Sequence, residues 1–109
     1  MTVTYVTQQS NPAATTETDL YTVPTVSVSK IVTMTVCNQG VAGSFRISRS
    51  VGGGATVAKD YLFYDAPIAA SGTASYVITT PYFANTGDKI KVYASHANMS
   101  FQLDAQEVV

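Results

Sequence analysis

The sequence predicts an all-β protein that folds as an antiparallel β-sandwich of about eight strands. Apolar and polar residues alternate along much of the chain, which is typical of strands with one buried face. Turn-forming residues interrupt this alternation at intervals of roughly ten residues, and no helical period is found between them. Short strands at this spacing are typical of a jelly-roll-like or an immunoglobulin-like sandwich, and the sequence does not distinguish the two.

Size and composition indicate one domain with a weakly charged surface. The chain has 109 residues, of which 46% are hydrophobic and 12% are charged. That charged share is about half of the roughly 25% that is typical of soluble domains. The surface must therefore be covered mostly by Thr, Ser, Asn and Gln, or in part by a partner. We expect a single β-sandwich domain over residues 19–109.

Residues 1–18 are expected to form an N-terminal extended arm or an edge strand. The stretch "TVTYVTQQ" has high β propensity, and no charged residue precedes Glu17. It is interpreted either as a first edge strand followed by a loop, or as an arm that adds to the sheet of a neighbouring subunit. For the arm, the candidate anchors are Val3, Tyr5 and Val6.

The alternation assigns a core-facing and a solvent-facing side to three strands. The residues expected to face the core are Phe45, Ile47, Ile90, Val92, Ala94, Met99, Phe101 and Leu103. The residues expected to face away from it are Arg46, Ser48, Lys89, Lys91, Tyr93, Ser100, Gln102 and Asp104. In a fourth strand the alternation places Val32, Met34 and Val36 on one face and Ile31, Thr33 and Thr35 on the other. A further strand around residues 61–64 is apolar on both sides, which predicts a central place in its sheet.

Few residues suggest catalysis or metal binding, so we expect a protein that is not an enzyme and has no cofactor or metal. His96 is the only histidine, and no nucleophile or second ligand stands near it in sequence. Cys37 is the only cysteine, and we expect it to be buried as a small hydrophobe. The aspartates lack the spacing of a calcium loop, and the "GGG" of residues 52–54 lacks a following helix.

The net charge and the N-terminal sequence limit the classes of partner and the cellular compartment that we expect. Six Lys and Arg against seven Asp and Glu provide no cationic footprint for nucleic acid. The N-terminus lacks the basic start and apolar block of a secretory signal, and no apolar stretch is long enough to span a membrane. We therefore expect neither nucleic-acid nor membrane binding, and synthesis as a soluble chain in the cytoplasm. Seven tyrosines, among them Tyr64, Tyr82 and Tyr93, are expected at interfaces or at sheet edges.

Several segments, in their order along the chain, resemble a family of small tailed-phage virion proteins. These segments are "LYTVP" at residues 20–24, "VCN" at 36–38, "FRIS" at 45–48, "YDAPI" at 64–68, "GDKIKVYAS" at 87–95 and "SF" at 100–101. The resemblance covers roughly residues 18–109 and leaves the N-terminal segment outside. Members of the family are similar to capsid decoration (cement) proteins, or to tail or fibre components, of phages that include those of cyanobacteria.

The resemblance implies a non-enzymatic capsid decoration protein on the virion surface. Such a protein would form a small homo-oligomer, a trimer or a dimer, and bind the major capsid protein at the outside of the shell. The alternative is a tail-fibre or receptor-binding module that recognises a host glycan through the loops "VGGGA" and "SHAN". For that alternative the candidate residues are Tyr93, His96 and Asn98.

Overall fold

A computed structural model describes residues 2–25, 28–70, 75–77 and 82–108. Within these residues the chain forms nine strands and two single-turn 3-10 helices, so the predicted all-β class is confirmed. The strands are β1 (Val3–Ser10), β2 (Thr18–Thr22), β3 (Val28–Asn38), β4 (Gly43–Ser50), β5 (Tyr61–Ile68), β6 (Ser75–Val77), β7 (Tyr82–Ala84), β8 (Lys89–Ala94) and β9 (Met99–Val108). The helices are η1 (Val51–Gly53) and η2 (Ala58–Asp60). No helix in the described part is long and apolar enough to cross a membrane.

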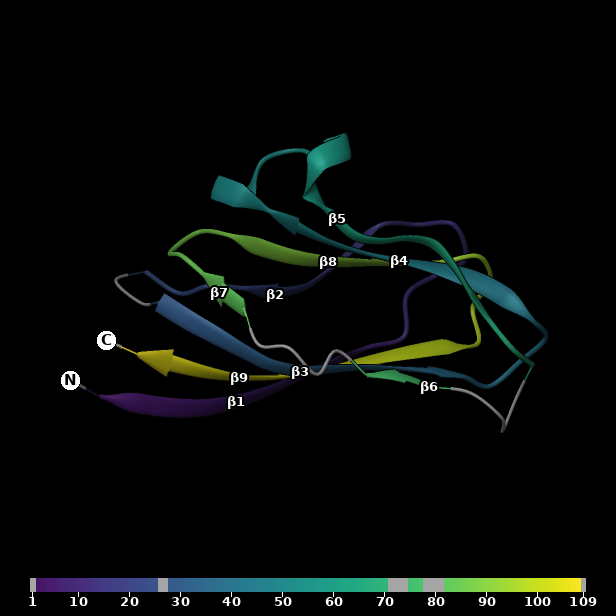
Figure 1. Cartoon of the computed structure of the whole chain (residues 1–109), viewed down its shortest axis with the longest axis horizontal. Helices are drawn as coiled ribbons and strands as arrows, with labels where there is room; N and C mark the ends of the chain where they lie inside the picture. The colour runs from purple at the N-terminus through teal and green to yellow at the C-terminus, as the bar shows by residue number, and fades with distance from the viewer. Residues whose placement is uncertain (1, 26–27, 71–74, 78–81, 109) are drawn as a thin grey trace.

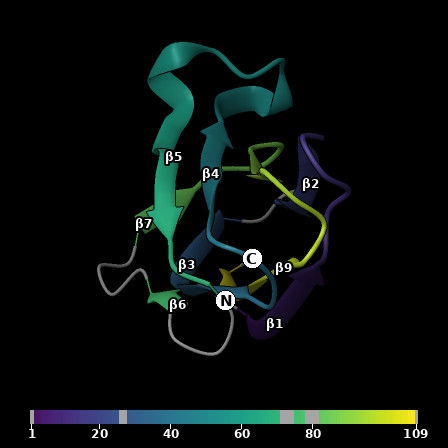
Figure 2. The same cartoon turned by 90° about the vertical axis from the view of Figure 1, so that its right-hand side faces the viewer.

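The strands form two antiparallel sheets that lie one above the other (Figures 1 and 2). The five-stranded sheet has the order β1-β9-β3-β6, with β7 also paired to β3, and the four-stranded sheet has the order β2-β8-β4-β5. The pairs are nested along the chain: β1 pairs with β9, β2 with β8, β3 with β6 and β7, and β4 with β5. The chain therefore runs as one long hairpin rolled into two layers.

The core lies between the sheets and includes all the residues that alternation assigned to it. Buried there, at no more than 1% exposure, are Met34, Val36, Phe45, Ile47, Ile90, Val92, Ala94, Met99, Phe101 and Leu103. The predicted inward faces of β4, β8 and β9 are thus confirmed, and β3 turns the face with Met34 and Val36 inward. Burying such aliphatic and aromatic side chains is the main source of folding free energy. The side chains of Ile31 and Val32 lie outside the described part.

The predicted central position of the strand at residues 61–64 is wrong. This strand, β5, lies at the edge of the four-stranded sheet, and its Leu62 and Tyr64 side chains are 39% and 59% exposed. Phe63 faces inward and packs against the core. The prediction assumed that the outward apolar side chains of this strand would also be buried. Tyr64 instead stays on the outer surface, where its ring packs against Arg46 of β4.

Two residues assigned to the outward side, Ser48 and Lys91, are buried. Ser48 stands opposite Lys91 in the unbroken register of β4 with β8, so both lie on the outward side as predicted. Lys91 faces away from the core, yet its side chain is only 10% exposed. The loop after β4 covers it, and its Nζ donates a hydrogen bond to the Gly54 carbonyl.

Cys37 is exposed, which contradicts the expectation of a buried thiol. Met34 and Val36 point inward from β3, so strand geometry turns the next residue outward together with Thr33 and Thr35. Cys37 is exposed because of its position in the alternation, although cysteines on average prefer the interior.

Candidate functional site

The outer side of the five-stranded sheet is an extended surface of short polar side chains. It is built by the three longest strands, β1, β3 and β9, whose register aligns outward residues in rows. We call it the threonine–glutamine face; its residues are Val3, Tyr5, Thr7, Gln9, Thr33, Thr35, Cys37, Ser100, Gln102, Asp104 and Gln106. In one such row Thr7 and Thr33 flank Asp104, and in the next Gln9 and Thr35 flank Gln102.

Hydrogen bonds between strands hold these side chains in place. Thr7 Oγ1 donates to Asp104 Oδ1 at 2.7 Å, and Thr33 Oγ1 donates to Asp104 Oδ2 at 3.2 Å. Gln9 Nε2 donates to Gln102 Oε1 at 3.1 Å. Among the side chains described on this face, Asp104 is the one charged group, and both of its oxygens accept hydrogen bonds. The described part of the face is therefore polar with a single charge, so covering that part does not require the removal of water from many ions.

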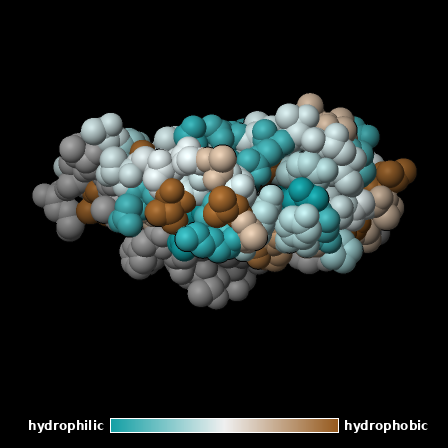
Figure 3. Space-filling view, turned by 90° about the horizontal axis from the view of Figure 1, so that it is seen from above, coloured by the Kyte–Doolittle hydropathy of each residue, from teal (hydrophilic) through white to brown (hydrophobic). Residues whose placement is uncertain are grey.

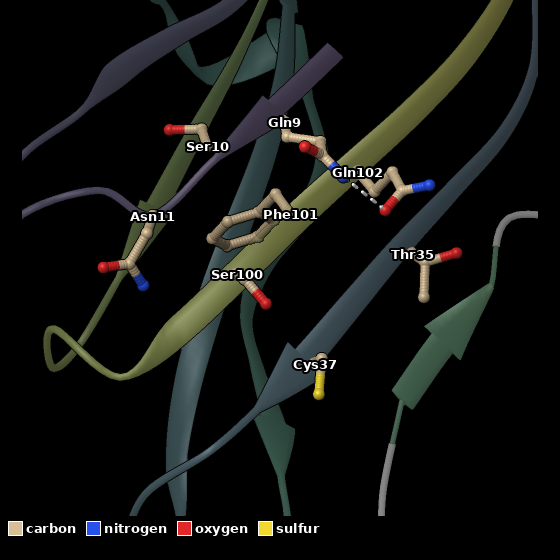
Figure 4. Close-up of a pocket in the computed structure, with 8 residues that line it drawn as sticks. All are labelled: Gln9, Ser10, Asn11, Thr35, Cys37, Ser100, Phe101 and Gln102. Carbon is tan, nitrogen blue, oxygen red and sulfur yellow. Dashed lines mark hydrogen bonds between the residues drawn. The ribbon is translucent and has the colours of Figure 1, made fainter. Parts of the chain in front are cut away.

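A shallow depression of about 360 Å³ lies at the end of this face where β1, β3 and β9 meet (Figure 4). Its lining comes from Gln9, Ser10, Asn11, Thr35, Cys37, Ser100, Phe101 and Gln102. Apart from the Phe101 ring, these are hydroxyl, amide and thiol groups. Within the described residues no group of three or more His, Cys, Asp or Glu side chains could hold a metal ion.

The three N-terminal candidate residues divide between the two sides of β1. Val3 and Tyr5 point outward at one edge of the threonine–glutamine face and are 42% and 76% exposed. Val6 points toward the second sheet and packs against the core. β1 itself pairs with β9 along its whole length, from Val3 opposite Val108 to Ser10 opposite Phe101. It is an edge strand of its own sheet, and Val3 and Tyr5 are exposed on its outward side.

The structure does not bring the three candidate glycan residues together. His96 and Asn98 lie in the turn between β8 and β9, where His96 Nδ1 accepts a hydrogen bond from the Asn98 amide. The other ring nitrogen, Nε2, therefore carries the proton and donates to the Val41 carbonyl at 2.8 Å. His96 thus ties this turn to the β3–β4 loop. Tyr93 belongs instead to a cluster around Arg46.

The two loops proposed for glycan binding lie at opposite ends of the four-stranded sheet. In the pairing of β4 with β8, Phe45 stands opposite Ala94 and Ser50 opposite Lys89. The "SHAN" turn follows Ala94, whereas the "VGGGA" loop follows Ser50. Five residues along β4 correspond to about 17 Å at the rise of a strand. One small ligand could not contact both loops.

A cluster that the sequence did not reveal lies on the outer side of the four-stranded sheet. The Arg46 guanidinium lies between the rings of Tyr64 and Tyr93, 4.3 Å from each centroid. Its Nε and Nη2 donate to the two carboxylate oxygens of Asp65 at 2.7 and 3.3 Å. The hydrogen bond to Asp65 raises the pKa of Arg46 above its ordinary value, and the charge of Asp65 adds to the effect. We call this group the tyrosine–arginine stack.

A β-bulge produces the stack, which is why alternation could not predict it. Phe45 pairs with Ala66 and Ile47 with Phe63, so that Arg46 stands opposite two residues, Tyr64 and Asp65, instead of one. Asp65 adopts a positive φ of 48°, a conformation that aspartate tolerates better than most residues. The extra residue lets a ring and a carboxylate contact the same guanidinium.

Beside the stack lies a second open depression, of about 530 Å³, lined by Thr56, Val57, Ala58, Tyr61 and Tyr64. The Tyr61 and Tyr64 rings meet edge to face, with centroids 4.8 Å apart. Figure 3, which views the molecule from this side, shows apolar side chains as separate groups among polar ones. The surface offers exposed aromatic edges and not one broad apolar patch.

The fold and these two surfaces define a β-sandwich whose exposed features are suited to binding. No protein-family model, curated protein or solved structure matches the chain. Its function is therefore argued from its own geometry.

Proposed function

We propose that this protein is a non-enzymatic capsid decoration protein of a tailed phage. It binds the outer surface of the major capsid protein lattice through its threonine–glutamine face and stabilises the head. The observation that carries the proposal is the character of this face: three long strands present a continuous polar surface with one described charge, Asp104, and the exposed Tyr5 at its edge. Tyrosine is enriched at protein interfaces because it combines a large stiff ring with a polar tip.

The energetics of a lattice favour a contact of this kind. A ligand that binds the assembled shell but not its dissociated subunits stabilises the assembly by mass action. Identical sites repeat over the shell, and a homo-oligomer that contacts two or three of them gains avidity without new contacts. A moderate, weakly charged interface is then sufficient, and its strength depends little on salt because few ions are paired in it.

We further propose that the sandwich is of the jelly-roll type. The nested pairing of first strand with last, second with next to last, and so on inward supports this type over the immunoglobulin type. Jelly rolls occur among viral capsid and lectin domains. This is an argument by analogy of fold, and it adds to the surface argument without replacing it.

The first test is the number of copies of this chain in each virion, measured by quantitative mass spectrometry against the major capsid protein. A decoration protein should be present at a ratio near one to one, or at another simple fraction set by the lattice. A few copies to a few dozen would contradict the proposal and place the protein in the tail or fibres.

The second test uses Cys37 as a probe, because it is the only cysteine of the chain and lies exposed on the proposed binding face. Iodoacetamide should alkylate Cys37 readily in the free protein and slowly on the intact particle. The control is a Cys37→Ser, Val51→Cys variant, which moves the thiol to an exposed position in η1, in the loop that follows β4 of the other sheet. Equal alkylation of Cys37 in the two states would exclude this face as the contact.

The second candidate function is a receptor-binding module for a host glycan. The observation that favours it is the pair of tyrosines, Tyr61 and Tyr64, that line the open depression beside the tyrosine–arginine stack. Aromatic rings beside hydroxyl groups can bind a sugar by stacking and hydrogen bonding, and Thr56 supplies such a hydroxyl. This site replaces the set of Tyr93, His96 and Asn98, which the fold separates.

Binding to a glycan array tests this alternative. Binding that is lost in a Tyr64→Ala variant and retained in a His96→Ala variant, together with a low copy number per virion, would favour the receptor-binding function. No glycan binding by the intact protein would remove it.

A further inference from the structure

The four edges of the two sheets differ in how they are protected. An exposed strand edge offers unpaired backbone groups to another strand, and proteins usually block it with charges, proline, bulges or short length. β2 has five residues, a register shift and Asp19. β5 has register shifts, Asp65 and Pro67. β6 and β7 are three residues each in the described part of the chain.

β1 has none of these protections. It is eight residues long, pairs with β9 without a register shift, and contains neither a charge nor a proline. No described strand pairs with its other side. Figures 1 and 2 show β1 at the border of the lower layer, with nothing of the described chain beside its outer edge. An edge of this kind is open to pairing with a further strand.

The same features suit β1 to pairing with itself. In a two-fold antiparallel pair, residues near the two-fold axis face their own copies, so a charge there would lie near a like charge, which is unfavourable. Self-pairing of β2 or β5 about Asp19 or Asp65 would bring together two copies of that carboxylate, whereas β1 contains no charged side chain in any register. We propose that two copies of this protein pair β1 to β1 and form a dimer with one continuous sheet across the seam.

Because side chains alternate along β1, the dimer would bury side chains on both the outer and the inner side of the seam. A register centred on Tyr5 or on Val6 keeps the outward residues on one side and places Tyr5 of both copies directly opposite or diagonally adjacent on the outer face. They also bring together the two Val6 side chains, which face the second sheet and are partly exposed in the single chain. Backbone hydrogen bonds along the strands add to this contact. The dimer is thus held by aromatic, aliphatic and backbone contacts at one seam.

The dimer follows from the edge strand and does not depend on what the protein binds. One consequence does rest on the proposed function: the seam would join two threonine–glutamine faces into one, with the Tyr5 pair near its centre. Residues at the centre of an interface tend to contribute most of its binding energy.

The first experiment measures the oligomeric state of the full chain by sedimentation over a range of concentrations, without any shell. We expect a monomer–dimer equilibrium whose dissociation constant rises by about tenfold or more in Tyr5→Lys, because like charges then face each other across the seam. Tyr5 is 76% exposed, so this change should leave the monomer folded. The control is Val51→Lys, which adds the same charge at a 69% exposed position in η1, in the loop that follows β4 of the other sheet.

A charge-reversal pair makes the test independent of folding defects. Tyr5→Lys and Tyr5→Glu should each be weakened as a dimer, and their mixture should form heterodimers. A monomer at all concentrations, a dimer unaffected by either variant, or a dimer dissociated by Val51→Lys but not by Tyr5→Lys would overturn the proposal. Shell binding is measured separately, so failure of the dimer and failure of the proposed function can be told apart.

Discussion

At the scale of single residues, Asp88 shows how one buried carboxylate can organise a loop cluster. It is 4% exposed and precedes β8. Its Oδ1 accepts the amide of Gly52 at 2.8 Å, and its Oδ2 accepts the amide of Asn85 at 2.9 Å. Its carbonyl accepts the amide of Val23 at 3.0 Å. The loop after β4, the turn before β8 and the segment after β2 therefore meet at one residue.

We expect Asp88→Ala to lower the free energy of unfolding by about 1–3 kcal/mol, because it leaves backbone donors without their acceptor in a buried place. The matched control is Asp19→Ala, which removes an exposed carboxylate that pairs with Lys89 at 3.1 Å. An exposed ion pair contributes about 1 kcal/mol or less. Chemical denaturation of both variants measures the difference. Equal losses would show that burial of Asp88 has no energetic consequence.

The tyrosine–arginine stack leads to a prediction about the planar shape of the Arg46 guanidinium and about how its contribution to stability depends on pH. In Arg46→Lys the charge stays, but the planar group that stacks on two rings and pairs with both oxygens of Asp65 is lost. We expect a loss of about 1 kcal/mol in the free energy of unfolding. The pKa of Arg46 is raised in the folded state by its hydrogen bond to Asp65, so its stabilising effect is complete below its ordinary, strongly basic pKa.

The difference between Arg46→Lys and the unaltered protein should therefore be constant from pH 6 to pH 9. Denaturation curves at several pH values across this range check it. A difference that disappears by pH 9 would contradict the assignment, because the guanidinium remains protonated throughout.

At the scale of elements, the alternation of apolar and polar residues predicted regular strands well and irregular ones poorly. It assigned the inward residues of β8 and β9 correctly, because β8 pairs with β4 and β9 pairs with β1 without a register shift. It did not predict that Ser48 and Lys91 are buried on the outward side, because that depends on a loop and not on the strand itself. A register shift between β4 and β5 brings Asp65 to Arg46, so the stack could not be predicted either. A bulge depends on the partner strand, which the sequence of one strand does not specify.

The candidate binding residues show the same limit. Exposure of Val3 and Tyr5 agrees with a weakly charged strand at a sheet edge, which its sequence suggested. The separation of Tyr93 from His96 was not predictable, because both lie within four residues on the chain. Their surroundings depend on which strands and loops pack beside them, and these come from segments around residues 41 and 64.

The two sides of β1 lead to a prediction that separates folding from association. Val6→Ser should lower the free energy of unfolding by about 1 kcal/mol, because Val6 packs against the core. Tyr5→Ser should change it by less than about 0.5 kcal/mol in the monomer, because surface substitutions usually do. Denaturation at concentrations that keep the chain monomeric measures both effects. A larger loss for Tyr5→Ser than for Val6→Ser would contradict the assignment of sides.

This prediction also explains why removing residues 1–10 is a poor test of binding. β1 covers the edge of β9 along its whole length, so its deletion would expose that strand and remove part of the core. A loss of shell binding could then result either from the missing binding residues or from the damaged fold. Single substitutions at Tyr5 avoid this ambiguity.

At the scale of the whole molecule, the nested pairing predicts an order of folding. The innermost pair, β4 with β5, is joined by a connection of ten residues, whereas β1 and β9 come from opposite ends of the chain. Closing a loop costs more entropy as the loop grows, so the inner pair can form first. Proteins dominated by such distant pairings fold slowly, in milliseconds to seconds.

Two conservative substitutions test this order through their effects on folding and unfolding rates. Ile47→Val, in β4, should act mainly by slowing folding, because its contacts form in the transition state. Val6→Ala, in β1, should act mainly by speeding unfolding, because its contacts form late. Stopped-flow measurements on the monomer, at several denaturant concentrations, give both rates for each variant. If Val6→Ala slows folding as much as Ile47→Val does, the outer pair already takes part in the transition state. The chain would then close from its ends rather than from its inner hairpin.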